Sequence, residues 1–451
     1  MRLEFSRCVV TAIFASLFAA SDAHAQSVVP GPGATGTRAT TLNNASATPP
    51  QQTLGQLIGF ICPPGNLLSS DLQARCNDIV RAVVLDRNNA GAQAALQAMA
   101  PEENSAVQTV GVDANEQQDE NVRDRLEHCR QRLLNGKDEA APQDGLSEDA
   151  GACAEDAGDS RWGLYLNGNF GIGDKDSTAR ETGFSMNSYG VTGGADYRLT
   201  DASLLGMSLG YTGQNVDLDS NSGKLDTDAV AVSIYGSYYP SAASYVNVIG
   251  MYTVTGHDQE RNIVYSIAGR PSNVNQKAIS DTVSDEIAGS VEAGYDFQRA
   301  QWTLTPYARI DIAHTEIDGY SERMSNPNAQ GSGLAMQIDD QDFTSLTTAF
   351  GARAASSIMM ERFDLFPQVG IEYLHEFEND NEDTTGRFVD DRSRSTFLLP
   401  TDAPDRNYAN VSAGLSADFR NGWSGHFAYQ GLLGYKDLQV HVFEIGVRLQ
   451  Y

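Results

Sequence analysis

The stretch VFEIGVRLQY, residues 442–451, alternates between two kinds of side chain. Its large apolar positions are Phe443, Ile445, Val447, Leu449 and Tyr451, and the residues between them are polar or small. Because successive side chains of a β-strand point to opposite faces, this comb predicts a strand with one apolar and one polar face. Something other than water must cover the apolar face.

The same alternation extends from about Arg161 to the end of the chain. We predict about twelve strands, at residues 162–173, 184–199, 204–218, 225–239, 244–258, 284–298, 302–317, 343–360, 363–377, 407–420, 423–435 and 438–451. Short connectors such as YPSAAS and FRNG alternate with longer ones, including residues 259–283, 318–342 and 378–406. Short turns at one end and long loops at the other are typical of an outer-membrane barrel.

Strand length separates a membrane barrel from the alternative, a water-soluble β-sandwich. A sandwich would explain the alternation, but soluble strands usually have about five or six residues, and the strands predicted here are more than twice as long. Aromatic residues also gather at the strand ends, as they do at membrane interfaces. We therefore expect a closed transmembrane β-barrel of about 12 antiparallel strands, with Tyr451 facing lipid at the membrane edge.

The first half of the chain has a different organisation and predicts four segments. Residues 1–25 have a positive start, a short apolar core and the small-x-small site Ala23-His24-Ala25, which together predict a signal peptide. Residues 26–53 are rich in Ser, Thr, Ala, Gly and Pro and predict a flexible leader. Residues 54–135 have helical apolar spacing, with a possible capping box at Ser70 and Gln73, and residues 136–160 predict an acidic linker.

Cleavage of the signal peptide would remove Cys8 and leave an even number of cysteines. In an exported chain this predicts two disulfides among Cys62, Cys76, Cys129 and Cys153. Proximity in the sequence favours Cys62 with Cys76 and Cys129 with Cys153, although four cysteines allow three pairings. A disulfide is also the better interpretation of Cys129 than a reactive thiol beside His128.

Charge and motifs exclude several functions. The formal net charge of −28 argues against nucleic-acid binding, which needs a basic face. We find no nucleophile with a plausible base and orienting group, so we expect no enzyme activity, and we predict no catalytic residue, cofactor or metal site. The acidic runs at 339–342 and 378–383 lack the spacing of a calcium loop. Charges on the inner strand faces, Arg309 and Glu372 among them, could select ions or could pair to hold the barrel interior together.

The second half of the chain also resembles a known family, the autotransporter β-domain of Gram-negative bacteria. The matching stretches include GLYLNGNFGIGDKD (163–176), YGVTGGADYRLTD (189–201), TPYARIDIAHTEIDGYSE (305–322) and the long run from LPTDAPDRNYANVSAGL to the end (399–451). The resemblance covers residues 161–451 and implies a twelve-stranded barrel in the outer membrane, entered by a helical linker. It also implies that the terminal comb, Phe443 to Tyr451, is an insertion signal for the barrel-assembly machinery.

The chain departs from that family where a passenger is expected. Passengers are mostly long β-helices with few cysteines, whereas the region between the signal and the barrel is short, helical and cysteine-bearing. We therefore keep two hypotheses. In the first, the barrel inserts through its C-terminal signal and exports, displays or anchors the N-terminal segment at the cell surface, where its ligand is unknown. In the second, the barrel is a structural or channel-forming outer-membrane protein whose N-terminal segment stays in the periplasm or plugs the pore.

Overall fold

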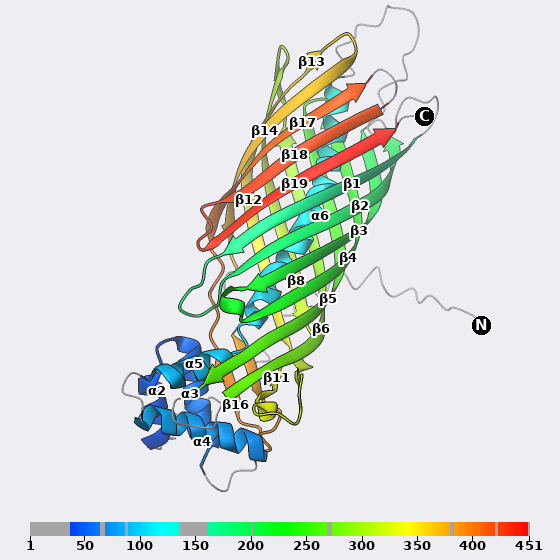
Figure 1. Cartoon of the computed structure of the whole chain (residues 1–451). Coiled ribbons are helices and arrows are strands. Elements are labelled where there is room, and N and C mark those ends of the chain that lie inside the picture. The colour runs from blue at the N-terminus through cyan, green and yellow to red at the C-terminus, as the bar shows by residue number, and fades with distance from the viewer. Residues whose placement is uncertain are drawn as a thin grey trace, which may run out of the picture.

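The computed structural model describes residues 37–63, 68–85, 89–135, 161–200, 202–267, 273–378, 383–419 and 423–449. The predicted signal peptide, the linker 136–160, Cys153 and Tyr451 lie outside these residues. The centre of the structure is a closed antiparallel barrel of 12 strands, which confirms the predicted fold class (Figure 1).

The barrel strands follow one another around the wall in chain order, and pairing of the last strand with the first closes the ring. They are β1 (Trp162–Lys175), β2 (Phe184–Thr200), β3 (Ser203–Leu218), β4 (Gly223–Ser241), β5 (Ser244–Ser266), β6 (Asn273–Tyr295), β8 (Trp302–Ile317), β12 (Gln341–Ser356), β14 (Phe363–Glu376), β17 (Asn407–Phe419), β18 (Trp423–Leu433) and β19 (Leu438–Leu449). Closure leaves no open sheet edge along the ring, as a membrane-spanning sheet requires.

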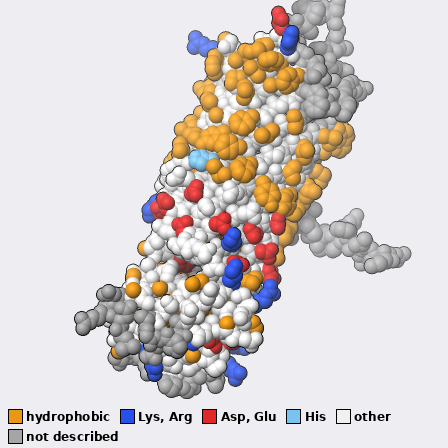
Figure 2. All heavy atoms as spheres, in the orientation of Figure 1, with side chains coloured by type: hydrophobic (Ala, Val, Ile, Leu, Met, Phe, Trp, Pro, Cys, Tyr) orange, Lys and Arg blue, Asp and Glu red, His pale blue; other side chains and the backbone are white. Residues whose placement is uncertain are grey.

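The terminal comb lies on the outer face of β19. Ile445 and Val447 are each 63% exposed, and Phe443 lies between Phe170 of β1 and Tyr429 of β18 in the ladder. Figure 2 shows that apolar side chains gather over the half of the barrel nearest the C-terminal end of β19, and that charged side chains lie between this band and the helices. The comb is therefore part of an apolar outer surface that lipid can cover.

Aromatic side chains mark both edges of the apolar band. At the edge near the short turns, Trp162 packs on Tyr197 and Tyr295 on Phe297, with ring centroids 5.0 and 4.8 Å apart. At the other edge, the Tyr252 hydroxyl donates to the Asp285 carboxylate at 2.5 Å. An apolar ring body with a polar tip suits a membrane interface, so the two rows set the limits of the membrane-spanning part.

A charge placed within the band should be costly. We expect Ile445→Arg to destabilise the barrel by about 2–4 kcal/mol, because the side chain would face hydrocarbon near mid-band. The unfolding midpoint of the refolded barrel in lipid vesicles would measure this. Gln439→Arg is the matched control, since Gln439 is on the same strand and the same face but beyond the band, and it should leave the midpoint unchanged.

The long loops contain more sheet than the sequence predicted. Residues 259–283 were expected to form a loop, but β5 and β6 continue as a paired hairpin that projects past the band. The other long loops hold β9 (Tyr320–Ser321), β10 (Arg323–Met324), η2 (Ser332–Leu334), β11 (Met336–Ile338), β15 (Thr384–Phe388) and β16 (Thr396–Leu399). Strands β9, β11, β15 and β16 form a separate sheet at this end. The remaining short elements are η1 (Asp219–Asn221), β7 (Phe297–Arg299) and β13 (Ile358–Met359).

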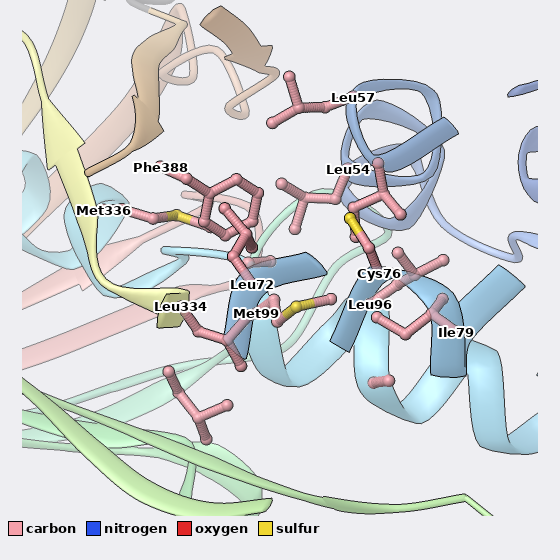
Figure 3. Packing of buried hydrophobic residues seen from close by; sticks show 14 of the residues in the cluster. Leu54, Leu57, Leu72, Cys76, Ile79, Leu96, Met99, Leu334, Met336 and Phe388 are labelled. Atoms are coloured by element: carbon pink, nitrogen blue, oxygen red, sulfur yellow. The ribbon is translucent and has the colours of Figure 1, made fainter. Parts of the chain in front are cut away.

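Four helices sit on the long-loop end, and we call them the cap: α2 (Thr37–Ala45), α3 (Pro49–Ile61), α4 (Ser70–Leu85) and α5 (Ala90–Met99). Their buried side chains form one core with side chains of the loops. Figure 3 shows Leu54, Leu72 and Met99 of the cap beside Leu334, Met336 and Phe388 of the loops. The cap therefore has no separate core of its own, which accords with its small size.

The cap corrects two predictions and contains one predicted disulfide. The expected flexible leader includes α2 and the start of α3, because Thr48 caps α3 through the Gln51 amide and Leu42 is buried in the shared core. At α4 the Leu72 amide donates to the Ser69 hydroxyl, so the cap residue is Ser69 rather than Ser70. Cys62 is bonded to Cys76 with an S–S distance of 2.03 Å.

Candidate functional site

The candidate functional site is the barrel lumen, through which a single helix runs. This helix, α6 (Glu103–Asn135), leads from the cap toward the short-turn end of the barrel (Figure 1). Within the predicted helical region 54–135, the stripe of Val122, Leu126, Cys129 and Leu133 located this helix only from about Asp119 to Leu134. In the first half, Ala106, Val107 and Val110 pack on an apolar part of the wall that includes Phe184 and Leu225, but this stripe is only about one turn long and was not recognised.

A ladder of polar contacts joins α6 to strand β2. Gln117 donates to Ser188 at 2.8 Å, Asn121 to Thr192 at 2.8 Å and Arg125 to Asp196 at 2.9 Å. Each pair is 71 residues apart in the sequence, so helix and strand advance together in steps of four. Buried hydrogen bonds of fixed register hold the helix at one height and one rotation.

Gln118 adds a second row of contacts and fits against a glycine. Its amide nitrogen donates to Thr212 at 2.6 Å, and its amide oxygen accepts from Thr192 at 2.6 Å. A Cβ at Gly210 would lie 1.8 Å from that oxygen. Gly210 is therefore required by the close approach of the helix.

We expect Gly210→Ala to displace Gln118 and to cost about 1–3 kcal/mol, because buried hydrogen-bonding groups would lose their partners. Hydrogen exchange of the α6 amides would report the loss of protection. Gly250→Ala is the control, since its Cβ would approach no atom more closely than 4.0 Å. Equal protection in both variants would contradict the proposed close fit.

Ion pairs fill much of the lumen around the helix. Arg130 of α6 pairs with Asp296, Arg353 with Glu292 at 3.0 Å, and Arg309 with Glu372 at 2.9 Å. These are inner-face charges for which the sequence left two roles open. Their direct pairing supports the structural role, in which opposite charges compensate each other's burial.

An apolar patch completes the attachment of α6 to the wall. Val122, Leu126 and Cys129 pack against Leu204, Tyr235 and Ile249, all of them buried. Cys129 is disulfide-bonded. The predicted pairing with Cys153 remains a prediction, because Cys153 lies outside the described residues.

A charged cluster joins α6 to the cap beyond the apolar band. Arg261, from the projecting part of β5, binds Glu322 through two hydrogen bonds of 2.9 and 2.6 Å and lies 3.2 Å from Glu103. Arg261 also donates to the Met99 carbonyl at the end of α5. Burial raises the pKa of Glu103 from 4.5 to about 8, and Arg261 opposes this shift.

The raised pKa of Glu103 predicts a pH dependence. The folded protein binds more protons than the unfolded chain between pH 4.5 and 8, so the contribution of Glu103 is fully present below pH 4.5 and is lost as the pH rises toward 8. Hydrogen exchange at the start of α6, corrected for its intrinsic pH dependence, should therefore show weaker protection at pH 8 than at pH 5. Glu103→Gln should remove this difference; an unchanged difference would assign it to another group.

The histidines of the barrel half lie apart on the wall, for example His257 beside Ser284 and His426 beside Glu444. Among the described residues no group of three or more potential ligands is placed to hold a metal ion. In the same part of the chain no helix is both long enough and apolar enough to cross a membrane.

A closed twelve-strand barrel with an apolar band defines the class of integral outer-membrane proteins. The family model of the autotransporter beta-domain matches residues 164–430, and the chain belongs to this family. The translocator domain of the autotransporter NalP from Neisseria meningitidis has the same fold, with a TM-score of 0.52, 14% identity and coverage of 77% of this chain and 99% of that one.

Curated relatives align over part of their length. Esterase EstA of Pseudomonas aeruginosa is 25% identical over 292 residues, which are 62% of this chain and 42% of the relative. An uncharacterized protein from the trpE-trpG intergenic region of Pseudomonas putida is 25% identical over 202 residues, which are 44% of this chain and 31% of the relative. The chain thus spans less than half the length of the relatives that it matches.

Proposed function

We propose that the barrel carries its own N-terminal segment across the outer membrane and holds it at the cell surface as a fixed cap. The observation that supports this is the path of the chain. The cap helices α2–α5 precede α6 and lie at the long-loop end, whereas β1 begins at the short-turn end, so α6 threads the lumen between the two. Long loops are extracellular and short turns periplasmic in such barrels, which supports an extracellular cap.

Display of an attached cap fits the structure better than release of a passenger. The cap shares its core with the loops, and α6 continues from the cap into a lumen where it is held by hydrogen bonds and ion pairs. The pore-plugging part of the second hypothesis applies to α6, which occupies the lumen. We propose no catalysis for the cap, because the esterase relative aligns over less than half of its length.

Two assembly steps belong to this proposal. The comb of Phe443, Ile445, Val447, Leu449 and Tyr451 serves as the signal that the barrel-assembly machinery reads. The segment then passes the lumen before α6 settles against the wall. The disulfide Cys62–Cys76 encloses a sequence separation of only 14 residues, so it forms a small loop that is compatible with passage in either redox state.

Cysteine labelling on cells tests the orientation. Val84 of α4 is 74% exposed on the cap, and Arg299 lies exposed at the end of β7, next to a short turn at the opposite end. A membrane-impermeant maleimide should label Val84→Cys on intact cells and should label Arg299→Cys only after the outer membrane is permeabilised. The unsubstituted protein gives the background. Labelling of Val84→Cys only after permeabilisation would overturn the proposal and place the cap in the periplasm.

A further inference from the structure

Helix α6 does not fill the lumen. It lies against β1–β5, and on its other side a cavity of about 730 Å³ extends along β14, β17, β18 and β19. The cavity reaches the long-loop end at residues 175–181, 402–405 and 436–438. Its volume is within the range of sites that take small organic molecules.

The helix presents an acidic edge to this cavity. Glu116, Glu120, Asp124 and Glu127 all line it, at the spacing that places residues on one helix face. Glu444 of β19 adds a further carboxyl group beside Asp124. Among the described lining residues, β17, β18 and β19 bring no lysine or arginine to the cavity.

The basic residues that do line the cavity have acidic partners or lie at its outer end. Arg353 binds Glu292 and also contacts Glu127 at 3.4 Å. Lys175 is paired with Glu181. Within α6, Glu120 is bonded to Arg123 and Glu127 to Arg130, so these two carboxylates are compensated by the helix itself. Over all the described lining residues, eleven acidic side chains still outnumber four basic ones.

The opposite wall is mixed, with Gln368, Asn410 and Gln430 among its polar residues, and it includes an apolar part. Leu432, Val440 and Val442 line it from β18 and β19. Near the outer end, the rings of Tyr408 and Tyr435 meet edge to face with centroids 5.2 Å apart, and both line the cavity. Aromatic faces attract ammonium and guanidinium groups, so this pair and the acidic edge favour the same kind of ligand.

We propose that the lumen cavity is a binding site for small organic cations that carry an apolar body. The ammonium or guanidinium group lies on the carboxylates of α6, where the low dielectric strengthens the attraction. The apolar body lies on Leu432, Val440 and Val442. Anions are repelled by the acidic edge, and neutral analogues lose the charge interaction. This inference does not depend on the direction in which the cap is displayed.

The test is calorimetric titration of the full-length protein in lipid nanodiscs with phenethylamine, phenethyl alcohol and 3-phenylpropanoate. Glu116→Gln/Glu120→Gln/Asp124→Asn removes the acidic edge. Asp226→Asn/Asp228→Asn/Asp258→Asn is the matched control, since these exposed aspartates lie on the outer wall and the change in net charge is the same. Val442→Trp fills the cavity and leaves its charges in place.

We expect the amine to bind the wild type and the outer-wall variant equally and the lumen variant at least tenfold more weakly. We expect Val442→Trp to abolish binding of the amine, and the alcohol and the carboxylate to bind at least tenfold more weakly than the amine. Equal binding of the amine to the wild type and the lumen variant would overturn the proposal. Equal heats for amine and alcohol in all variants would show partition into lipid only and would also overturn it.

Discussion

Phe388→Ala is expected to release the cap from the barrel while leaving the barrel closed. Phe388 of β15 is 0% exposed and belongs to the core that the loops share with Leu54 and Leu72 of the cap. Truncation of a fully buried phenylalanine typically costs about 3–5 kcal/mol, because contacts are lost and a cavity remains. That cost acts on the cap interface and not on the strand ladders of the membrane-spanning part.

Native-state proteolysis measures this effect. Cleavage within the cap should proceed through local opening and should become about two to three and a half orders of magnitude faster in Phe388→Ala. The heat-modifiable gel mobility of the barrel should not change. Phe350→Ala is the matched control, because Phe350 is 61% exposed on the lipid face of β12. A cap that stays as resistant as in the wild type would show that the shared core does not hold it.

The barrel was predictable because its signal is repeated and local. Period-two alternation with aromatic residues at the ends located all twelve strands, since each strand has one face toward lipid and one toward the lumen. The pairing of β1 with β19 could be predicted because a membrane-spanning sheet must close without an open edge. Ile445 and Val447 of the comb are exposed on the outer face of the barrel, as the alternation predicted.

The cap and the lumen were less predictable because their partners are distant in the sequence. Leu42 gives no helical period, yet it is buried in a core that includes Phe388 and Leu399. The hairpin beyond Asp258 has mixed side chains, and its sheet is stabilised by the cap that packs on it. The ladder of Gln117, Asn121 and Arg125 could have been found only by comparing α6 with β2 at a fixed offset, once both were assigned.

The ion pair between Arg125 and Asp196 should show the second large effect. Their side chains are 3% and 0% exposed, and their atoms lie 2.9 Å apart. Asp196→Ala would leave the guanidinium buried without this partner, at a cost of about 3–5 kcal/mol to the docking of α6. Hydrogen exchange of the α6 amides should then be faster by about two to three and a half orders of magnitude, with the amides of β3 and β4 unchanged.

A double variant separates the need for a partner from the need for a charge. In Arg125→Met/Asp196→Leu both charges are replaced by apolar groups of similar size, and such exchanges are often neutral or stabilising, so α6 should be protected nearly as in the wild type. Asp217→Ala removes the partner of Lys224 in a surface pair, in which the side chain of Lys224 is 59% exposed and that of Asp217 is 68% exposed. This variant should have no measurable effect on the protection of α6. If the double variant lost as much protection as Asp196→Ala, the charges themselves would be holding the helix. If Asp196→Ala lost no protection, the helix would be held by the neutral hydrogen bonds of Gln117 and Asn121 and by the apolar patch around Leu126.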